Sequence, residues 1–285
     1  MTNLSLFYNN PNHRGPGKVV QNLKKGLEQL QIISIDNQYD KNNFSGILQP
    51  HSILNQNNIE IKNFILGPNL FVLPNEWGKF CQKFNNYIVP SNWIYKKYRD
   101  FSELDHAKIN IWSVGIDTDK WNISLRKKEK NLKCLLYFKN RSLQDLAVAK
   151  KILSKYNIEY KELIYGSYSE EELFSSCSWA DFGILLTNTE SQGIAYMEIL
   201  STNLPCFVFN KTTWNNEGRY KSVEATSVPY FDKRCGEIVD DVNLVKFEEF
   251  LNNIDKNLYN PRDYIIENHT LKISATNYIN LFATI

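Results

Sequence analysis

The sequence predicts an α/β fold of two domains, each built on a parallel β-sheet that helices cover on both faces. Three observations lead to this prediction. The chain has 285 residues, of which 42% are hydrophobic, enough for sizeable cores. Short apolar runs alternate with amphipathic segments along almost the whole length, as in parallel sheets. The series of runs restarts after a polar stretch at 117–131, which divides the chain into halves of ordinary domain size.

The N-terminal half contains six apolar runs with the length and composition of buried strands. They are Leu4–Tyr8, Ile32–Ile35, Gly46–Gln49, Phe64–Leu66, Tyr87–Val89 and Ile109–Val114. Between the first two runs, apolar residues recur at helical spacing, which predicts a first helix; they are Val19, Val20, Leu23, Leu27 and Leu30. We assign residues 1–120 to the N-terminal domain.

The C-terminal half repeats the pattern with four runs at Cys134–Phe138, Tyr160–Ile164, Phe182–Leu186 and Cys206–Phe209. We assign residues 121–267 to a second domain of the same class. The stretch Leu271–Phe282 is apolar on one face, which predicts a helix. We treat 268–285 as a separate C-terminal helix that packs on one of the domains, with the N-terminal domain as a candidate.

Composition argues against several classes of protein. Lys and Arg total 33 and Asp and Glu total 31, a net charge of +2, which disfavours nucleic-acid binding. The five cysteines occur singly, without a C-x-x-C pair, which predicts reduced thiols rather than disulfides or a zinc site. No signal-peptide pattern or membrane-spanning apolar stretch is apparent. We therefore expect a cytoplasmic protein, with at most peripheral attachment to the inner membrane face.

The first candidate site follows the first strand, where Gly15, Pro16 and Gly17 lead into the first helix. Glycines let backbone N–H groups approach a ligand, and a helix N-terminus favours an anion. The segment matches neither the dinucleotide-binding fingerprint nor the P-loop. An ordinary turn between strand and helix explains it equally well.

A second candidate site follows the first strand of the second domain, where the chain reads Lys139-Asn140-Arg141. Cations at the carboxyl end of a parallel strand are well placed to neutralise a diphosphate leaving group, and arginine can bind phosphate oxygens bidentately. The alternative is a solvated turn, in which basic residues are common.

The most informative segment runs from Thr187 to Glu198, after a predicted strand and into a predicted helix. Its two carboxylates, Glu190 and Glu198, do not share a helix face, because eight helical residues rotate by about 800°. With Glu190 in the preceding loop they can reach different parts of one elongated ligand, and carboxylates accept hydrogen bonds from sugar hydroxyls. The intervening residues Ser191, Gln192 and Gly193 can offer backbone N–H groups to a diphosphate. Two surface glutamates are the simpler alternative.

These motifs together resemble the signature of retaining GT-B glycosyltransferases of family 4. The pair Glu190-x7-Glu198 stands in E-S-Q-G-I-A-Y-M-E-I-L-S, followed by Leu204-Pro205. Further segments agree in order, namely the Gly15–Gly17 region, V-P-S-N-W at 89–93, V-G-I-D at 114–117 and Y-G-S-Y at 165–168. The resemblance implies two Rossmann-like domains that face a central cleft. The N-terminal domain would serve the acceptor and the C-terminal domain would bind a nucleoside-diphosphate sugar.

The resemblance also implies roles for individual residues. Glu190 would contact hydroxyls of the transferred sugar, and Glu198 the ribose hydroxyls. Backbone groups of Gln192, Gly193 and Ile194 would contact the sugar and diphosphate, and Ser191 belongs to the same segment.

Lys139 and Arg141 would clamp the diphosphate, although the family often has R-x4-K where this chain has Lys-Asn-Arg. Gly166 and Tyr168 would border the nucleobase. Ser91, like Gly15, Pro16 and Gly17, would line the substrate site. The family tends to carry a histidine near the donor sugar, for which His51 is the first candidate and His13 the second.

The predicted function is therefore retaining transfer of a sugar from a nucleotide donor, with UDP- and GDP-sugars favoured, to a hydroxyl of a glycan, a lipid-linked intermediate or a protein glycan. The resemblance implies front-face attack, which requires no carboxylate nucleophile, and we expect no cofactor and no metal. Three alternatives remain open. They are another GT-B activity such as a phosphorylase or epimerase, a non-catalytic protein that binds nucleotide sugars or carbohydrates, and glycosylation of nucleic-acid bases.

Overall fold

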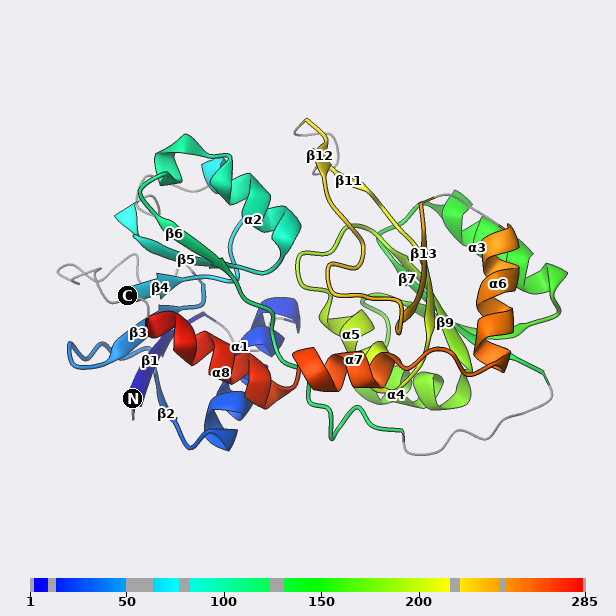
Figure 1. Cartoon of the computed structure of the whole chain (residues 1–285), viewed down its shortest axis with the longest axis horizontal. Coiled ribbons are helices and arrows are strands. Elements are labelled where there is room, and N and C mark those ends of the chain that lie inside the picture. The colour runs from blue at the N-terminus through cyan, green and yellow to red at the C-terminus, as the bar shows by residue number, and fades with distance from the viewer. Residues whose placement is uncertain are drawn as a thin grey trace. The chain divides into compact units, whose positions relative to one another are not determined.

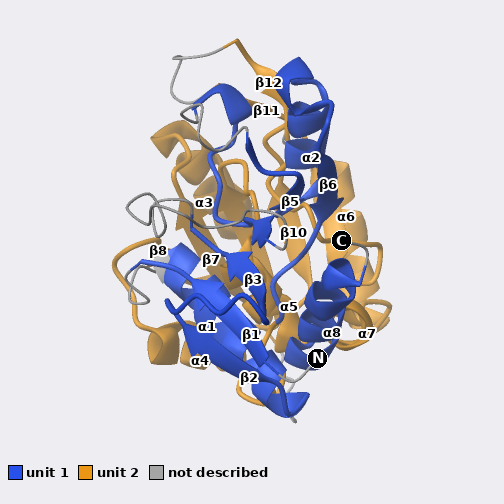
Figure 2. Ribbon diagram, turned by 90° about the vertical axis from the view of Figure 1, so that its left-hand side faces the viewer, with its two compact units in different colours: residues 1–115, 269–285 blue, residues 116–268 orange. Residues whose placement is uncertain are grey.

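The computed structural model describes residues 3–9, 14–49, 64–76, 83–123, 131–215, 221–240 and 244–283. The chain divides into two compact units, unit 1 (residues 1–115 and 269–285) and unit 2 (residues 116–268), which Figure 2 shows in different colours. The predicted domains end at 120 and 267, and the units divide at 115/116 and 268/269.

Unit 1 contains a six-stranded parallel sheet with the order β2-β1-β3-β4-β5-β6. Its strands are β1 (Asn3–Phe7), β2 (Ile33–Asp36), β3 (Phe44–Ile47), β4 (Phe64–Leu66), β5 (Asn86–Val89) and β6 (Lys108–Ile111). All six predicted strands are present. The last one ends at Ile111, earlier than the predicted Val114, and the backbone N–H of Trp112 still donates to the carbonyl of Val89 on β5 at 3.0 Å.

The helices of unit 1 are α1 (Arg14–Gln29), α2 (Asn92–Arg99) and α8 (Leu271–Phe282), with short 3-10 turns η3 (Pro74–Glu76) and η5 (Ser102–Leu104). Helix α8 belongs to unit 1 and packs against α1, as Figure 1 shows. The two helices approach closely at Gly26, where a Cβ atom would lie 2.8 Å from that of Ala275. Helix α1 begins at Arg14, so Gly15, Pro16 and Gly17 form its first turn and are not the loop that the sequence predicts. Proline fits there because first-turn N–H groups have no intrahelical partner.

Unit 2 contains a five-stranded parallel sheet with the order β13-β10-β9-β7-β8. Its strands are β7 (Lys133–Lys139), β8 (Glu159–Ile164), β9 (Phe182–Thr187), β10 (Cys206–Phe209) and β13 (Gly236–Val239). The sequence analysis missed β13, which has only four residues and two of them polar or glycine, and the two-residue strands β11 (Thr213–Trp214) and β12 (Val223–Glu224). Such short strands carry too few residues for a periodic signal.

The central strands β7, β9 and β10 are buried on both faces, which explains their continuous apolar runs. On β7, Leu135 and Tyr137 belong to one core cluster, while Cys134 and Leu136 belong to the other. The first cluster includes residues of α4 (Glu170–Trp179), α5 (Ile194–Ser201) and α7 (Pro261–Asn268). The second includes residues of α3 (Leu143–Lys155) and α6 (Leu244–Asp255). Unit 2 is therefore a three-layer α/β/α domain.

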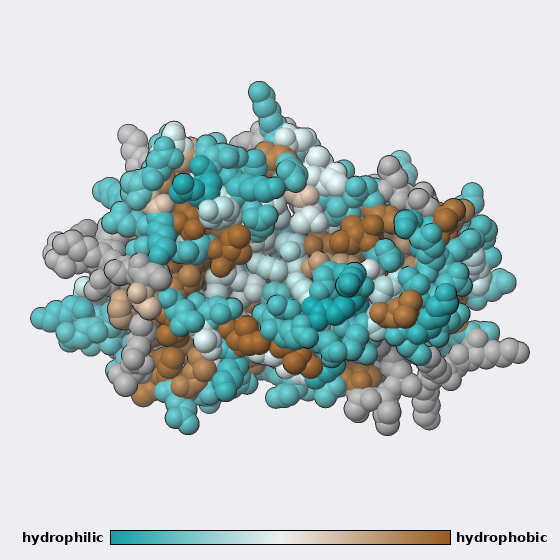
Figure 3. Space-filling model, viewed as in Figure 1, coloured by the Kyte–Doolittle hydropathy of each residue, from teal (hydrophilic) through white to brown (hydrophobic). Residues whose placement is uncertain are grey.

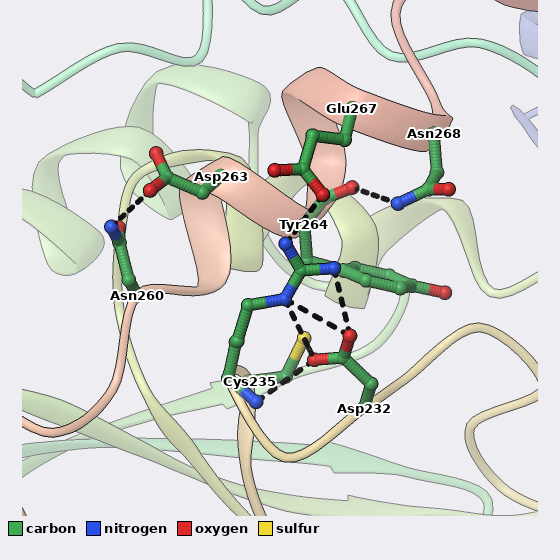
Figure 4. A network of polar contacts seen from close by, with 8 residues as sticks. Asp232, Cys235, Asn260, Asp263, Tyr264, Glu267 and Asn268 are labelled. Carbon is green, nitrogen blue, oxygen red and sulfur yellow. Dashed lines mark hydrogen bonds and ion pairs between the residues drawn. The ribbon is translucent and has the colours of Figure 1, made fainter.

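Two arginines fasten α7 within unit 2. Arg262 donates to the carbonyls of Thr118, Trp121 and Ser201 at 3.0, 3.0 and 2.7 Å. Arg234 forms ion pairs with Asp232 and with Glu267 of α7, and its guanidinium lies 5.4 Å from the ring centroid of Tyr264 (Figure 4). These contacts hold the last helix of unit 2 against its core before the chain returns to unit 1.

The surface drawn in Figure 3 mixes apolar and hydrophilic residues, and the four described cysteines are free thiols. On the face drawn in Figure 3, apolar residues form separate patches among hydrophilic ones. None of the described helices is both long and apolar enough to cross a membrane. The four described cysteines, Cys134, Cys177, Cys206 and Cys235, are buried and form no disulfide, in line with the predicted reduced thiols.

A buried histidine lies where the chain returns to unit 1, and we expect it to make the protein sensitive to acid. His269 is 5% exposed, its Nδ1 lies 3.0 Å from the Ser113 hydroxyl, and burial lowers its pKa from 6.5 to about 4. Between these values the unfolded chain binds a proton that the folded chain does not. This contribution to stability is therefore complete above pH 6.5 and is lost as the pH falls.

The expected loss through His269 between pH 7 and pH 4.5 is about 2.5 kcal/mol in the free energy of unfolding. Urea unfolding of the wild type and of His269→Gln at both pH values measures it. The variant should lose less stability on acidification by that amount. Equal losses in the two proteins would contradict the role assigned to His269.

Candidate functional site

The strand order of unit 2 identifies the edge at which a ligand is expected. From β7 the chain passes to β8 on one side and later to β9 on the other, so the direction of the connections reverses between β7 and β9. Open α/β sheets bind ligands beyond the carboxyl ends of their strands at such a point. Lys139 is the last residue of β7 and pairs in register with Thr187, the last residue of β9. The predicted site residues of unit 2 therefore belong to the expected edge.

An ion pair between Lys139 and Glu190 joins the two strand ends. The Lys139 Nζ lies 2.7 Å from one carboxylate oxygen of Glu190 and 2.9 Å from the other. The side chains are 22% and 11% exposed. On the lysine side, Nζ also lies 4.5 Å from the ring centroid of Tyr165, a cation–π contact. The ammonium is thus held between a carboxylate and an aromatic face.

The backbone holds Glu190 at this position. Its N–H donates to the carbonyl of Thr226, and the N–H of Asn188 donates to the carbonyl of Lys139, both at 2.9 Å. Burial raises the pKa of the Glu190 carboxyl above its ordinary value, and the charge and hydrogen bonds of Lys139 oppose that effect. The arrangement keeps a partly desolvated carboxylate next to a cation.

Helix α5 begins directly after this loop. Gly193 is its N-terminal cap, with φ +78° and ψ +41°, a left-handed conformation that glycine adopts without strain. Ser191 is exposed, Gln192 is buried, and Ile194 is the first helical residue. Glu198 lies within the helix and is 2% exposed. As the spacing predicts, Glu190 lies in the loop and Glu198 in the helix, while their roles stay predictions.

Arg141 lies at the same edge, but its guanidinium is engaged by protein groups. Its Nε donates to Asp145 at 2.9 Å, and its Nη1 donates to the carbonyls of Thr187 and Phe209 at 3.3 and 3.1 Å. Burial alone would raise the pKa of Asp145, but hydrogen bonds from Arg141 and Ser142 outweigh it and hold that pKa below its ordinary value. In this structure Arg141 ties α3 to the ends of β9 and β10. Its contact with a diphosphate stays a prediction.

The predicted nucleobase region follows β8. Gly166 has φ +94°, and the Tyr168 hydroxyl donates to that of Tyr137, 3.0 Å away. The two rings pack edge to face with centroids 5.9 Å apart. Tyr137 lies on β7, two residues before Lys139, so this contact connects the loop after β8 with the strand that carries the cation.

The predicted site did not include the segment that holds the Glu190 loop in place, which consists of Asn210 together with Thr226 and Ser227. Asn210 follows β10, and its side-chain oxygen accepts hydrogen bonds from the Thr226 hydroxyl and the Ser227 N–H at 3.0 and 2.9 Å. The Ser227 hydroxyl donates to the carbonyl of Thr187 at 3.0 Å. The position of Asn210, directly after a predicted strand, was the available signal.

The predicted site residues of unit 1 lie on different elements. Gly15, Pro16 and Gly17 are in the first turn of α1. Ser91 is the N-terminal cap residue of α2; it is fully buried, and its hydroxyl has no hydrogen-bond partner among the described residues. His51 and His13 lie outside the described residues.

Within the described ranges, no three His, Cys, Asp or Glu side chains gather as a potential metal site. The absence of a metal requirement remains a prediction.

The fold of the chain is similar to that of solved glycosyltransferases. No family model matches the chain, and no curated protein matches it. Among solved structures, the glycosyltransferase AviGT4, involved in avilamycin A biosynthesis, has a TM-score of 0.60 at 11% identity over 99% of this chain and 97% of that one. The lipopolysaccharide outer core galactosyltransferase WaaB, in its apo form, has a TM-score of 0.56 at 13% identity over 100% and 99% of the two chains. The chain has the GT-B fold.

A third GT-B match is an α-glucosyltransferase solved with UDP and a 13-mer DNA containing an HMU base. Its TM-score is 0.50 at 10% identity over 99% of both chains. The predicted fold class, two Rossmann-like α/β domains, is thus confirmed over the length of the chain. At these identities the matches establish the GT-B fold alone.

Proposed function

We propose that the protein is a retaining glycosyltransferase that moves a sugar from a nucleoside-diphosphate sugar to a hydroxyl acceptor. The observation that carries the proposal is the Lys139–Glu190 pair at the reversal point of the unit 2 sheet, followed directly by the helix that contains Glu198. The GT-B fold and the UDP bound by one structural neighbour support a nucleotide donor. We propose UDP- and GDP-sugars as the first donors to test.

Lys139, Glu190 and Glu198 would have different roles in the proposed reaction. The Lys139 ammonium would neutralise charge that builds on the leaving diphosphate, with the N-terminus of α5 adding its backbone N–H groups. Glu190 would accept hydrogen bonds from hydroxyls of the transferred sugar, and Glu198 from the ribose. The protein would contribute orientation and electrostatic stabilisation, and the donor phosphate would take the proton of the acceptor hydroxyl.

Glu198 gives the first test of this proposal. Wild type and Glu198→Gln are melted with UDP, GDP, ADP and TDP. A nucleotide at about 100 times its dissociation constant should stabilise the wild type by about 2.7 kcal/mol. The variant should lose most of that gain, because an amide accepts fewer hydrogen bonds from the two ribose hydroxyls than a carboxylate does.

The control is Glu172→Gln, at an exposed position on α4, which should retain the full nucleotide response. Melting without ligand shows whether each variant folds. No response of the wild type to any nucleotide would contradict the proposal and favour a binding protein without nucleotide chemistry. Once a donor is found, the anomeric configuration of the product, read by NMR, decides between retention and inversion.

A further inference from the structure

The cation that a diphosphate would need is already occupied by a protein carboxylate. The Lys139 Nζ contacts both oxygens of Glu190, at 2.7 and 2.9 Å, and the Tyr165 ring lies 4.5 Å from it. An ammonium has three donor hydrogens, so two donors directed at Glu190 leave one for any other acceptor. A phosphate group that binds Lys139 through more than one hydrogen bond must therefore displace Glu190.

Glu190 is held in this competing position by its backbone. Its N–H bonds to the carbonyl of Thr226, and its side chain is only 11% exposed. A carboxylate this far removed from water needs a cation or strong donors beside it. In the structure Lys139 donates to both carboxylate oxygens, so a ligand that takes Lys139 away removes these two contacts, and donors of the ligand can replace them.

Arg141 is bound more extensively by protein groups than Lys139 is. Its Nε and Nη1 hold Asp145 and the carbonyls at the ends of β9 and β10. Its side chain is 10% exposed, half the value for Lys139. Lys139 is therefore the member of the predicted basic pair that can change partners.

We infer that the Lys139–Glu190 ion pair is a resting arrangement that the donor exchanges on binding. Lys139 transfers its hydrogen bonds from Glu190 to the diphosphate, and the released carboxylate accepts hydrogen bonds from the sugar hydroxyls. Glu190 is thus an internal competitor of the diphosphate as well as a sugar-binding residue. A complete donor supplies both new partners, whereas a nucleoside diphosphate supplies only the one for Lys139. This inference rests on the proposed function.

Removing the negative charge of Glu190 is therefore expected to improve binding of a reaction product. Glu190→Gln should bind the nucleoside diphosphate about tenfold more tightly than the wild type, because Lys139 no longer leaves an anionic partner. Tenfold corresponds to about 1.4 kcal/mol, close to the lower end for a hydrogen bond to a charged group. The same variant should bind the uncharged nucleoside as the wild type does, and should turn over the donor more slowly.

Isothermal titration with the nucleoside diphosphate chosen by melting, with its nucleoside, and with inorganic pyrophosphate measures the three affinities. Glu162→Gln is the matched control, since it breaks the 2.6 Å Lys150–Glu162 ion pair of the same unit and should change none of them. In a Lys139→Met background, Glu190→Gln should no longer tighten diphosphate binding. Glu190→Ala provides a second variant with the same expected direction if Glu190→Gln melts much lower than the wild type.

The outcomes separate this inference from the function on which it rests. Wild type that binds a nucleoside diphosphate, with Glu190→Gln and Glu190→Ala binding it equally or more weakly, overturns the exchange and leaves the nucleotide site standing. Equal tightening of nucleoside and diphosphate also overturns it, since the gain would then not come from the cation. Absence of nucleotide binding in every protein refutes the proposed function itself.

Discussion

Replacing Lys139 by methionine is expected to slow turnover of the nucleotide-sugar donor by roughly 10²–10³-fold, the usual cost of removing one group that stabilises charge in a transition state. Methionine keeps an unbranched apolar side chain of similar length but carries no charge. The ammonium lies at the carboxyl end of β7, where the leaving diphosphate of the proposed reaction would gain charge. The loss should therefore fall mainly on kcat, measured as release of nucleoside diphosphate.

Two further variants control for structure. Lys133→Met changes the other end of the same strand, where the ammonium lies 5.5 Å from the Trp179 ring, and should leave turnover unchanged. Lys139→Met also leaves the buried Glu190 without its cation, which destabilises the fold. The double variant with Glu190→Gln removes both charges and should recover stability but not turnover. Wild-type kcat in a folded Lys139→Met protein would refute the electrostatic role.

The central strands were predictable because they are buried along their whole length. A strand such as β9, whose six residues are all buried, has an apolar run that no solvent-facing position interrupts. Helix α8 was predicted with its observed bounds, Leu271–Phe282, because its apolar face is distinct. In the structure Thr270 caps it by accepting from the Ile273 N–H at 3.1 Å. Local pattern was sufficient for these elements.

The partners of the site residues were not predictable, because they lie far away in sequence. Arg141 bonds the carbonyl of Phe209, 68 residues later, and Lys139 pairs with Glu190, 51 residues later. Sequence reasoning expected two equivalent cations after β7. The structure distinguishes them, since Arg141 is bound by two backbone carbonyls and by Asp145 four residues later, whereas Lys139 is bound by Glu190. The strand order, which places β7 beside β9, brings these distant partners together, and it could not be predicted from the sequence.

The start of α1 was predicted wrongly for a different reason. The sequence Gly15-Pro16-Gly17 contains the residues that punctuate most turns, so a loop was the natural prediction. Yet proline and glycine are tolerated in a first helical turn, where the lost N–H had no partner. Residue type alone does not distinguish the last residue of a loop from the first of a helix.

Gly193→Ala is expected to destabilise the protein by about 3 kcal/mol or more and to abolish nucleotide binding. The left-handed conformation of this residue, φ +78°, strains any side chain by about 1–2 kcal/mol. A Cβ atom would also lie 1.8 Å from Cε1 of Tyr196. That ring is fully buried, and its hydroxyl accepts the Tyr230 N–H at 2.9 Å, so it cannot move aside without losing core packing, typically a further 1–3 kcal/mol.

Urea unfolding measures the loss, and Gly15→Ala is the matched control. In the first turn of α1 an added Cβ meets no atom within 4 Å, so that substitution should be neutral or stabilise the protein by up to about 1 kcal/mol. Gly193 lies between the two glutamates, at the point where the loop of Glu190 becomes the helix of Glu198. A methyl group there must displace either the loop or the first turn of α5, so nucleotide binding should fail even in variants that remain folded at low temperature. A folded Gly193→Ala protein with wild-type nucleotide affinity would show that the helix N-terminus takes no part in the donor site.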